Sequence, residues 1–301
     1  MTRRGWLLFA AMAVIWGVPY LLIKIAVAEV SPATLVLMRT ALGAAILVPL
    51  AMFSGGLRAL VPHWRAVLLY TFVEVAAPWI LLSDAERRLS SSLSGLLIAG
   101  VPLVGALLAW LVGGDDRPDA RRLTGLVLGF AGVAVLVGLD VSTNDLGAVA
   151  EVGLVVVGYA IGPMIVARRL REVPAVGVIA ASLVLTAIAY APIGVAQLPA
   201  HIPSTQALLA VVLLGVVCTA VGFVLFFELI TEVGPNRATV ITYFNPVVAL
   251  ALGVALLGEP LTVGIGAGFA LIAFGSFVAT RRAQPVSTAQ RVVGALPPSP
   301  P

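Results

Sequence analysis

The chain has 301 residues, of which 60% are hydrophobic and only 11% are charged. Soluble domains carry about 25% charged residues, so this composition excludes an ordinary soluble protein and indicates one that crosses a membrane several times. The net charge of +4 comes from basic residues in short connections, so no nucleic-acid partner is predicted. The single cysteine, Cys218, excludes an intrachain disulfide, and with two isolated histidines we expect no metal and no other cofactor.

Ten apolar segments follow one another along the chain, each near the roughly 20 residues that a helix needs to cross a bilayer. They lie at residues 6–27, 32–53, 66–82, 93–112, 123–139, 146–167, 176–196, 207–230, 238–257 and 263–279. The predicted fold class is therefore an all-α integral membrane protein. The last residues, 283–301, are rich in proline and serine and are predicted to form a disordered cytoplasmic tail.

The basic residues predict the orientation, because short cytoplasmic connections are enriched in lysine and arginine. With the N-terminus inside, 14 of the 18 basic residues fall on the cytoplasmic side and only Arg87 and Arg88 fall outside. The other two, Lys24 and Arg39, lie within spans. We therefore expect both termini to be cytoplasmic.

A proline-centred segment occurs twice, and each copy ends in a glycine followed by a carboxylate. Other marks recur at the same offset of 144 residues. The pairs are Pro102 and Pro246, Gly114-Asp115 and Gly258-Glu259, Pro19 and Pro163, and Lys24 and Arg168.

These pairs predict two repeats, residues 1–140 and 146–282, with five spans each. Because five is odd, the second repeat enters the membrane in the opposite orientation. Inverted repeats surround a central site in many secondary transporters. The predicted architecture is two inverted five-helix repeats with hinges at four prolines, Pro19, Pro102, Pro163 and Pro246.

Ionisable side chains inside spans are costly and usually face a cavity or a partner. Glu74 lies near the middle of the third span, four residues after Tyr70, and Arg39 lies at similar depth in the second. Two interpretations stay open. Arg39 and Glu74 form a buried structural ion pair, or they line a substrate pathway in which Glu74 contacts a substrate amine or takes a coupling proton.

The first span carries Trp16, Tyr20 and Lys24 at positions i, i+4 and i+8, which places them on one face of a continuous helix. This face lines the substrate pathway, or it anchors the helix at the membrane interface with Lys24 extended toward water.

Tyr243 and Asn245 directly precede Pro246, whose ring frees a backbone carbonyl. They line a cavity or belong to a packing kink. Gly-x-x-x-Gly pairs in the fifth and tenth spans predict close helix packing, with contacts in a homodimer left open. These pairs are Gly125 with Gly129 and Gly264 with Gly268.

Several short motifs occur in a set order along the two repeats. They are Ile15-Trp16-Gly17, Lys24, Ser31-Pro32, Arg39, Ala85, Thr219-Ala220, Gly234, Tyr243, Pro246 and Gly258-Glu259-Pro260-Leu261. In their order and spacing, over about residues 6–280, the chain resembles the EamA-type transporters of the drug/metabolite transporter superfamily. The first repeat departs from the family's Gly-Glu-Arg pattern and reads Gly114-Asp115-Asp116-Arg117.

The resemblance implies a secondary transporter in the plasma (inner) membrane, with a small-molecule substrate such as an amino acid or a related compound. Alternating access is the implied mechanism and efflux the favoured direction. A channel-like or structural membrane protein, or a membrane-embedded enzyme, is the alternative. The sequence contains neither a Gly-x-x-x-x-Gly-Lys nucleotide loop nor a catalytic cluster, so no enzyme activity and no catalytic residue are predicted.

Overall fold

The computed structural model describes residues 2–53, 56–113 and 120–280, and all regular elements among them are helical. Ten helical stretches are long and apolar enough to span a membrane: Arg3–Ala26, Pro32–Phe53, Arg58–Ala85, Ser91–Leu111, Ala120–Asp140, Thr143–Arg169, Ala175–Ala196, Thr205–Val233, Val240–Leu257 and Val263–Thr280. The predicted all-α membrane protein with ten spans is confirmed. Gly114-Asp115 and the tail 283–301 lie outside the described residues.

The described residues of each half form ten helical elements. In the first half they are α1 (Arg3–Ile15), α2 (Pro19–Ala26), α3 (Pro32–Phe53), η1 (Arg58–His63), α4 (Trp64–Tyr70), η2 (Thr71–Ala76), α5 (Ala77–Ala85), α6 (Ser91–Ile98), α7 (Val101–Gly113) and α8 (Ala120–Asp140). In the second half they are η3 (Thr143–Asp145), α9 (Leu146–Arg169), α10 (Ala175–Ala196), α11 (Thr205–Leu213), η4 (Leu214–Val221), α12 (Gly222–Val233), α13 (Pro235–Ala238), η5 (Thr239–Tyr243), α14 (Asn245–Leu257) and α15 (Val263–Thr280).

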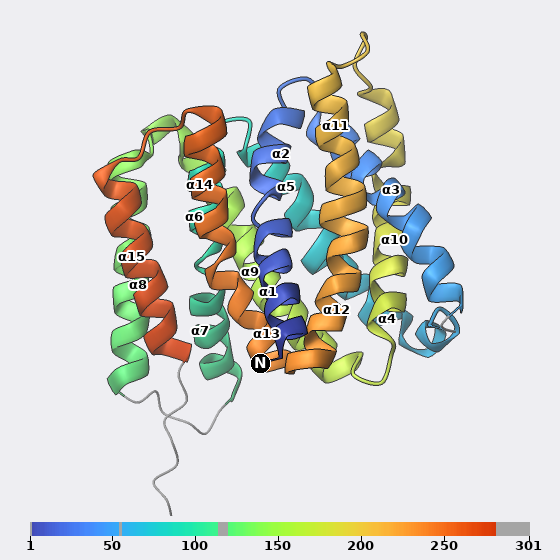
Figure 1. Cartoon of the computed structure of the whole chain (residues 1–301), viewed down its shortest axis with the longest axis horizontal. Coiled ribbons are helices and arrows are strands. Elements are labelled where there is room, and N and C mark those ends of the chain that lie inside the picture. The colour runs from blue at the N-terminus through green and yellow to red at the C-terminus, as the bar shows by residue number, and fades with distance from the viewer. Residues whose placement is uncertain (1, 54–55, 114–119, 281–301) are drawn as a thin grey trace, which may run out of the picture.

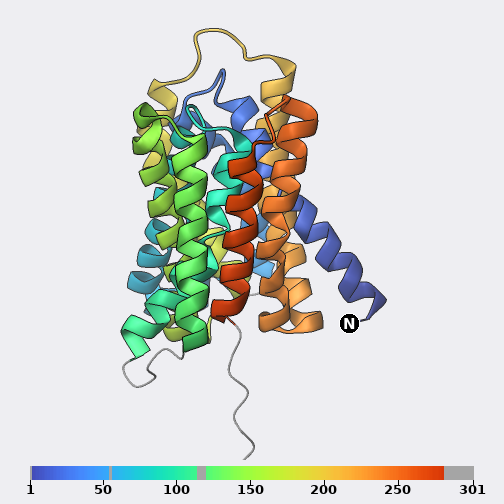
Figure 2. The same cartoon turned by 90° about the vertical axis from the view of Figure 1, so that its left-hand side faces the viewer.

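Successive spans run in opposite directions, so α1 begins and α15 ends at the same end of the bundle (Figure 1). We call this the terminal end and the opposite one the distal end. Equivalent spans of the two halves pack against each other: α3 against α10, α6 against α14, and α8 against α15. Figure 2 shows α8 and α15 side by side at the front of the bundle. Helices α2, α5 and α9 lie toward the middle (Figure 1).

Three of the four predicted hinge prolines begin a new helical segment. Pro19 is the first residue of α2, and Pro102 and Pro246 are the second residues of α7 and α14. Proline is tolerated in a first turn because its missing N–H would have no partner there. Pro163 instead lies inside the continuous helix α9. The four prolines therefore occupy two different structural settings.

The first span, expected over residues 6–27, is confirmed, but a turn over residues 16–18 separates α1 from α2 within it. Gly17 in this turn packs against α14, where an added Cβ would lie 2.5 Å from the Cβ of Val248. Only glycine allows this approach without displacing α14. The turn also interrupts the single helical face expected for Trp16, Tyr20 and Lys24.

Two π-helical turns, η2 and η4, widen the third and eighth spans. Shifted by the repeat offset of 144 residues, η2 falls within η4. A π turn inside an α-helix is rare and is frequently found at functional positions. The repeat symmetry therefore extends to a local irregularity that hydropathy does not indicate.

The glycines of α8 and α15 bring these two helices into close contact, which confirms the predicted packing. A Cβ on Gly125 would lie 2.4 Å from the backbone nitrogen of Ala279, and one on Gly268 would lie 2.9 Å from the Cβ of Leu136. A Cβ added to Gly275 of α15 would lie 2.3 Å from the backbone nitrogen of Gly129. These glycines therefore join the fifth and tenth spans of the same chain.

Replacing Gly275 with alanine should destabilise the α8–α15 pair. The added methyl meets backbone atoms that cannot move aside, and overpacking of this kind costs about 1–3 kcal/mol. Gly266→Ala in the same helix is the matched control, because nothing lies within 4 Å of its added Cβ. Thermal unfolding in detergent should show a lower midpoint for Gly275→Ala and an unchanged or higher one for Gly266→Ala. Equal midpoints for the two variants would contradict the packing described here.

Candidate functional site

Arg39 of α3 is buried, and no carboxylate among the described residues forms an ion pair with it. Its Nε donates a hydrogen bond to the Thr219 hydroxyl of η4 at 3.0 Å. Its guanidinium carbon lies 3.7 Å from the ring centroid of Trp79 in α5. A desolvated cation over an aromatic ring gains about 2 kcal/mol, which offsets part of the cost of burying the charge.

The alternative of an Arg39–Glu74 ion pair is therefore wrong. Among the ion pairs between described residues, none involves Arg39 or Glu74. The reason is geometric: Arg39 is directed to α5 and η4, whereas Glu74 is directed to α9.

Glu74 lies in η2 with its carboxylate against α9. An added Cβ on Gly162 would come within 1.9 Å of Glu74 Oε2, so only glycine leaves room for the carboxylate. Oε2 is buried and has no hydrogen-bond partner among the described residues. Tyr70, one turn earlier, is buried, and Tyr159 of α9 interacts electrostatically with Glu74. Because an unpaired polar atom in a nonpolar interior is costly, this carboxylate is a strong candidate to meet a ligand or a proton.

The side chains around these two charges form the central polar cluster. Its members come from α2, α3, α4, η2, α5, α9 and η4 and are Tyr20, Arg39, Tyr70, Glu74, Trp79, Tyr159 and Thr219.

Four of the predicted site residues, Tyr20, Arg39, Tyr70 and Glu74, thus come together. Sequence reasoning missed the roles of Trp79, Tyr159 and Thr219. Thr219 belongs to a motif of the family resemblance, which marks the position but not its hydrogen bond. Trp79 and Tyr159 stand in apolar spans where nothing distinguishes them from lipid-facing aromatics.

Trp16 lies at the edge of the central polar cluster. Its indole Nε1 donates to the Cys218 carbonyl of η4 at 3.2 Å, one residue before Thr219. Its ring lies 4.6 Å from that of Phe226 and 5.6 Å from that of Phe223, both in α12. These contacts hold the turn between α1 and α2 against the π turn of the eighth span.

Lys24 binds backbone rather than facing an open cavity. Its Nζ donates to the carbonyl oxygens of Glu86 and Leu89, at 2.7 and 2.8 Å, in the connection between α5 and α6. The Glu86 side chain is fully buried, and neither carboxylate oxygen has a hydrogen-bond partner among the described residues.

Glu86 was missed because it stands in a short charged run, residues 84–88, that is typical of an exposed connection. It lies outside the membrane-spanning segments. Burial raises the pKa of the Glu86 carboxyl well above its usual range, and the Lys24 ammonium only partly opposes this effect.

Two glutamates join neighbouring spans at the distal end by capping helices. Glu259 accepts hydrogen bonds from the backbone N–H groups of Ser91 and Ser92, at 2.7 and 2.9 Å, at the start of α6. Glu29, after α2, accepts from the backbone N–H of Ser204 before α11 at 2.6 Å. Carboxylates are favoured at helix N-termini because they satisfy free N–H groups and the helix dipole. The Glu259 cap joins the second half of the chain to the first.

Tyr243 and Asn245 lie apart from the central polar cluster. The Tyr243 hydroxyl lies 3.1 Å from the Thr280 hydroxyl at the end of α15. The Asn245 side-chain oxygen is buried and has no hydrogen-bond partner among the residues that the structure describes. The Asn245 backbone carbonyl approaches Gly17 in the turn between α1 and α2. Asn245 is therefore placed beside a helix break, whereas Tyr243 joins two spans at the terminal end.

At the terminal end, Arg4 forms ion pairs with Glu228 and Glu232 and so joins α1 to α12. Two hollows of about 470 and 310 Å³ lie at this end beside α4 and α9. Among the described residues, no three potential metal ligands stand together.

A ten-span bundle built from two similar halves around buried charges is the architecture of a multi-pass membrane transporter. The EamA-like transporter family model matches the chain twice, over residues 3–138 and 150–281. The chain therefore belongs to the EamA-like transporter family.

Similar proteins carry transporter names. The chain is 24% identical to "Uncharacterized transporter YvbV" of Bacillus subtilis, over 88% of each chain. It is 28% identical to "Uncharacterized inner membrane transporter YedA" of Escherichia coli strain K12, over 84% of this chain and 82% of that one. A solved structure described as "Crystal structure of protein" shares the fold, with a TM-score of 0.65 and 22% identity over 92% of this chain and 96% of the other.

The stacking of Arg39 on Trp79 can be measured with a double-mutant cycle of Arg39→Met and Trp79→Leu. We expect a coupling free energy of about 1–2 kcal/mol, from unfolding titrations in mixed detergent micelles. A second cycle of Arg39→Met with Glu74→Gln is the control and should give coupling of less than about 0.5 kcal/mol. Strong coupling to Glu74 and none to Trp79 would restore the ion-pair interpretation.

Proposed function

We propose that this chain is a secondary transporter that moves a small metabolite, an amino acid or a related compound, across the plasma (inner) membrane by alternating access. Efflux is the proposed direction, and both termini are proposed to be cytoplasmic. The observation that carries the proposal is the buried Oε2 of Glu74, unpaired among the described residues, in a cluster where Tyr159 interacts with both Glu74 and Arg39.

An amino acid carries one ammonium and one carboxylate, so its site needs one anion and one cation that do not neutralise each other. Glu74 and Arg39 meet this condition, because each points to a different neighbour. The ammonium would pair with Glu74 Oε2. The carboxylate would pair with guanidinium N–H groups of Arg39, which has five donors and uses Nε for Thr219. The tyrosine and tryptophan rings of the cluster would cover the substrate's apolar part.

The polar contacts of the distal end support alternating access. The distal end is joined by Lys24 to the α5–α6 connection, by Glu259 to α6, and by Glu29 to α11. We infer a conformation closed at the distal end and accessible from the terminal end, which with cytoplasmic termini is inward-facing.

Opening the distal end requires at least the Glu259 cap to part from α6. The segments on both sides of this contact, α6–α7 and η5–α14, each have a break at a proline. Such breaks let one half of a span tilt without moving the other. A channel-like protein needs no such alternation, and a membrane-embedded enzyme would change its substrate chemically.

Glu74→Gln should keep the fold and lower transport at least about tenfold, because an amide gives no countercharge to an ammonium group. Proteoliposomes preloaded with an amino-acid mixture would be assayed for counterflow of each labelled amino acid. Glu172→Gln is the matched control, since Glu172 is exposed after α9. Saturable counterflow in wild type and control supports a carrier. Non-saturable flux indicates a channel, product formation indicates an enzyme, and unimpaired flux in Glu74→Gln removes Glu74 from the site.

Pro102→Ala and Pro246→Ala should each slow transport several-fold and leave equilibrium binding within a few-fold, because a continuous helix resists the tilt that alternation needs. Pro163→Ala is the comparison, since Pro163 lies within an unbroken helix. Transport rates and binding constants would be measured in parallel for all three variants. If Pro163→Ala slows transport as much as the other two, the breaks at α7 and α14 are not the hinges.

A further inference from the structure

We propose a binding site for an anionic phospholipid at the terminal end, between α4 and α9, which holds the lipid's phosphate headgroup in one hollow and an acyl chain in the next. The proposal does not depend on the transported substrate. It rests on two adjoining hollows, one basic and one mainly apolar, on two arginines that form no ion pair among the described residues, and on an exposed tryptophan that lines the basic hollow.

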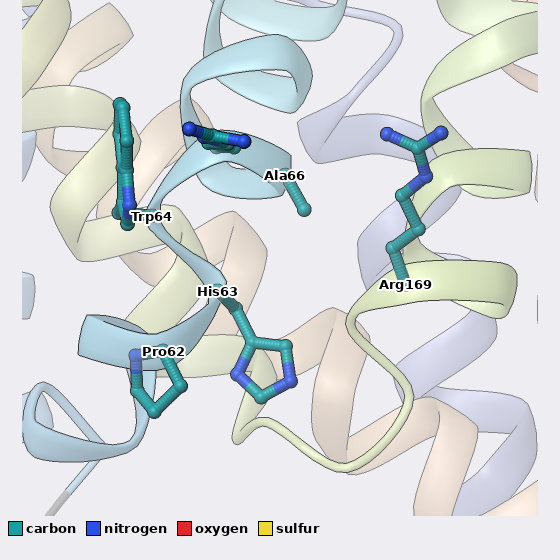
Figure 3. A pocket seen from close by; sticks show the side chains of 6 residues that line it. Pro62, His63, Trp64, Ala66 and Arg169 are labelled. Carbon is teal, nitrogen blue, oxygen red and sulfur yellow. The ribbon is translucent and has the colours of Figure 1, made fainter.

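The larger hollow, of about 470 Å³, is polar and basic. It is lined by Pro62, His63, Trp64, Arg65, Ala66 and Arg169. Figure 3 shows His63 and Arg169 on opposite sides of this hollow, the first from the connection before α4 and the second from α9. The His63 Nδ1 lies 3.3 Å from the Ala59 carbonyl oxygen, which fixes the orientation of the ring.

The arginines of this hollow have no anionic partner in the part of the chain that the structure describes. Arg65 and Arg169 are exposed, and neither appears in the ion pairs between described residues. The Arg65 guanidinium carbon lies 5.2 Å from the ring centroid of Trp64. Two guanidinium groups and an imidazole around one hollow complement a phosphate, for which arginine offers forked N–H donors.

The smaller hollow, of about 310 Å³, adjoins the first through Arg169 and is mainly apolar. Its lining is Leu69, Leu108, Ile161, Met164 and Ile165, with Arg168 and Arg169. These side chains belong to α4, α7 and α9. A ligand that fills both hollows must carry an anionic head and a hydrocarbon chain, which is the chemistry of an anionic phospholipid and not of a soluble phosphate.

Trp64 places the basic hollow at the level of lipid headgroups. Its side chain is 55% exposed although it is large and apolar. Tryptophan is enriched at the boundary between bilayer and water, where the indole is partly in hydrocarbon and partly among headgroups. Basic pockets between spans on the cytoplasmic side are a recurrent way to hold anionic lipid headgroups.

The test measures lipid binding to the purified full chain in detergent, by native mass spectrometry and thermal unfolding. The probes are phosphatidylglycerol, phosphatidylcholine and glycerol 3-phosphate. We expect one retained phosphatidylglycerol per chain and a higher unfolding midpoint, with much weaker effects of the other two. Each arginine near an anionic headgroup is worth about fivefold in affinity, so Arg65→Gln with Arg169→Gln should weaken phosphatidylglycerol binding about 25-fold.

Arg58→Gln with Arg171→Gln is the matched control, because both arginines are exposed near the same two elements but line neither hollow. It should bind phosphatidylglycerol within about twofold of wild type. Met164→Trp, which fills the apolar hollow, should weaken phosphatidylglycerol and leave glycerol 3-phosphate unchanged. Equal loss in the control, equal binding of phosphatidylcholine, or glycerol 3-phosphate binding as tight as the lipid's would each overturn the proposal. If the double variant does not fold, Met164→Trp and the three probes decide the question alone.

Discussion

A buried arginine and a buried glutamate stand in this bundle without pairing with each other, and the candidate site depends on that separation. Arg39 is held by the ring of Trp79 and the hydroxyl of Thr219. Glu74 is left against Gly162 with an unpaired oxygen. A buried ion pair would be inert toward a substrate, because a ligand would first have to break it. By supplying an aromatic ring for the cation and a glycine for the carboxylate, the fold leaves both charges available.

The two halves share their architecture but not their chemistry. Equivalent helices pack together, and π turns recur at the repeat offset in the third and eighth spans. Within these turns, however, Glu74 of the first half corresponds to Cys218 of the second. The second half contributes Tyr159, Thr219 and the backbone carbonyl of Cys218 instead. The shared architecture of the two halves fits the movement of one against the other. The different side chains at equivalent positions concentrate the candidate site's ionisable groups in the first half.

The spans and the α8–α15 contact were predictable because their signals are local: a run of apolar residues, or two glycines four residues apart. The partner of Arg39 was not predictable, since Thr219 is 180 residues away and equal depth suggested Glu74 instead. The cap on α6 depends on a residue 168 positions later, and the burial of Glu86 depends on helices folded around a charged connection. The position of a residue along a span predicts how deep it lies in the membrane. It does not predict which of the neighbouring helices its side chain faces.

The central claim is that the unpaired carboxylate of Glu74 receives an ammonium group, and equilibrium binding of paired ligands tests it most directly. An amino acid found to bind would be compared with its N-acetyl derivative, which keeps the carboxylate and side chain but lacks the positive charge. Calorimetry on the wild-type chain should show tight binding of the free amino acid and at least about tenfold weaker binding of the acetylated form, whereas Glu74→Gln should bind the two alike. Equal affinities in the wild-type chain would contradict the account.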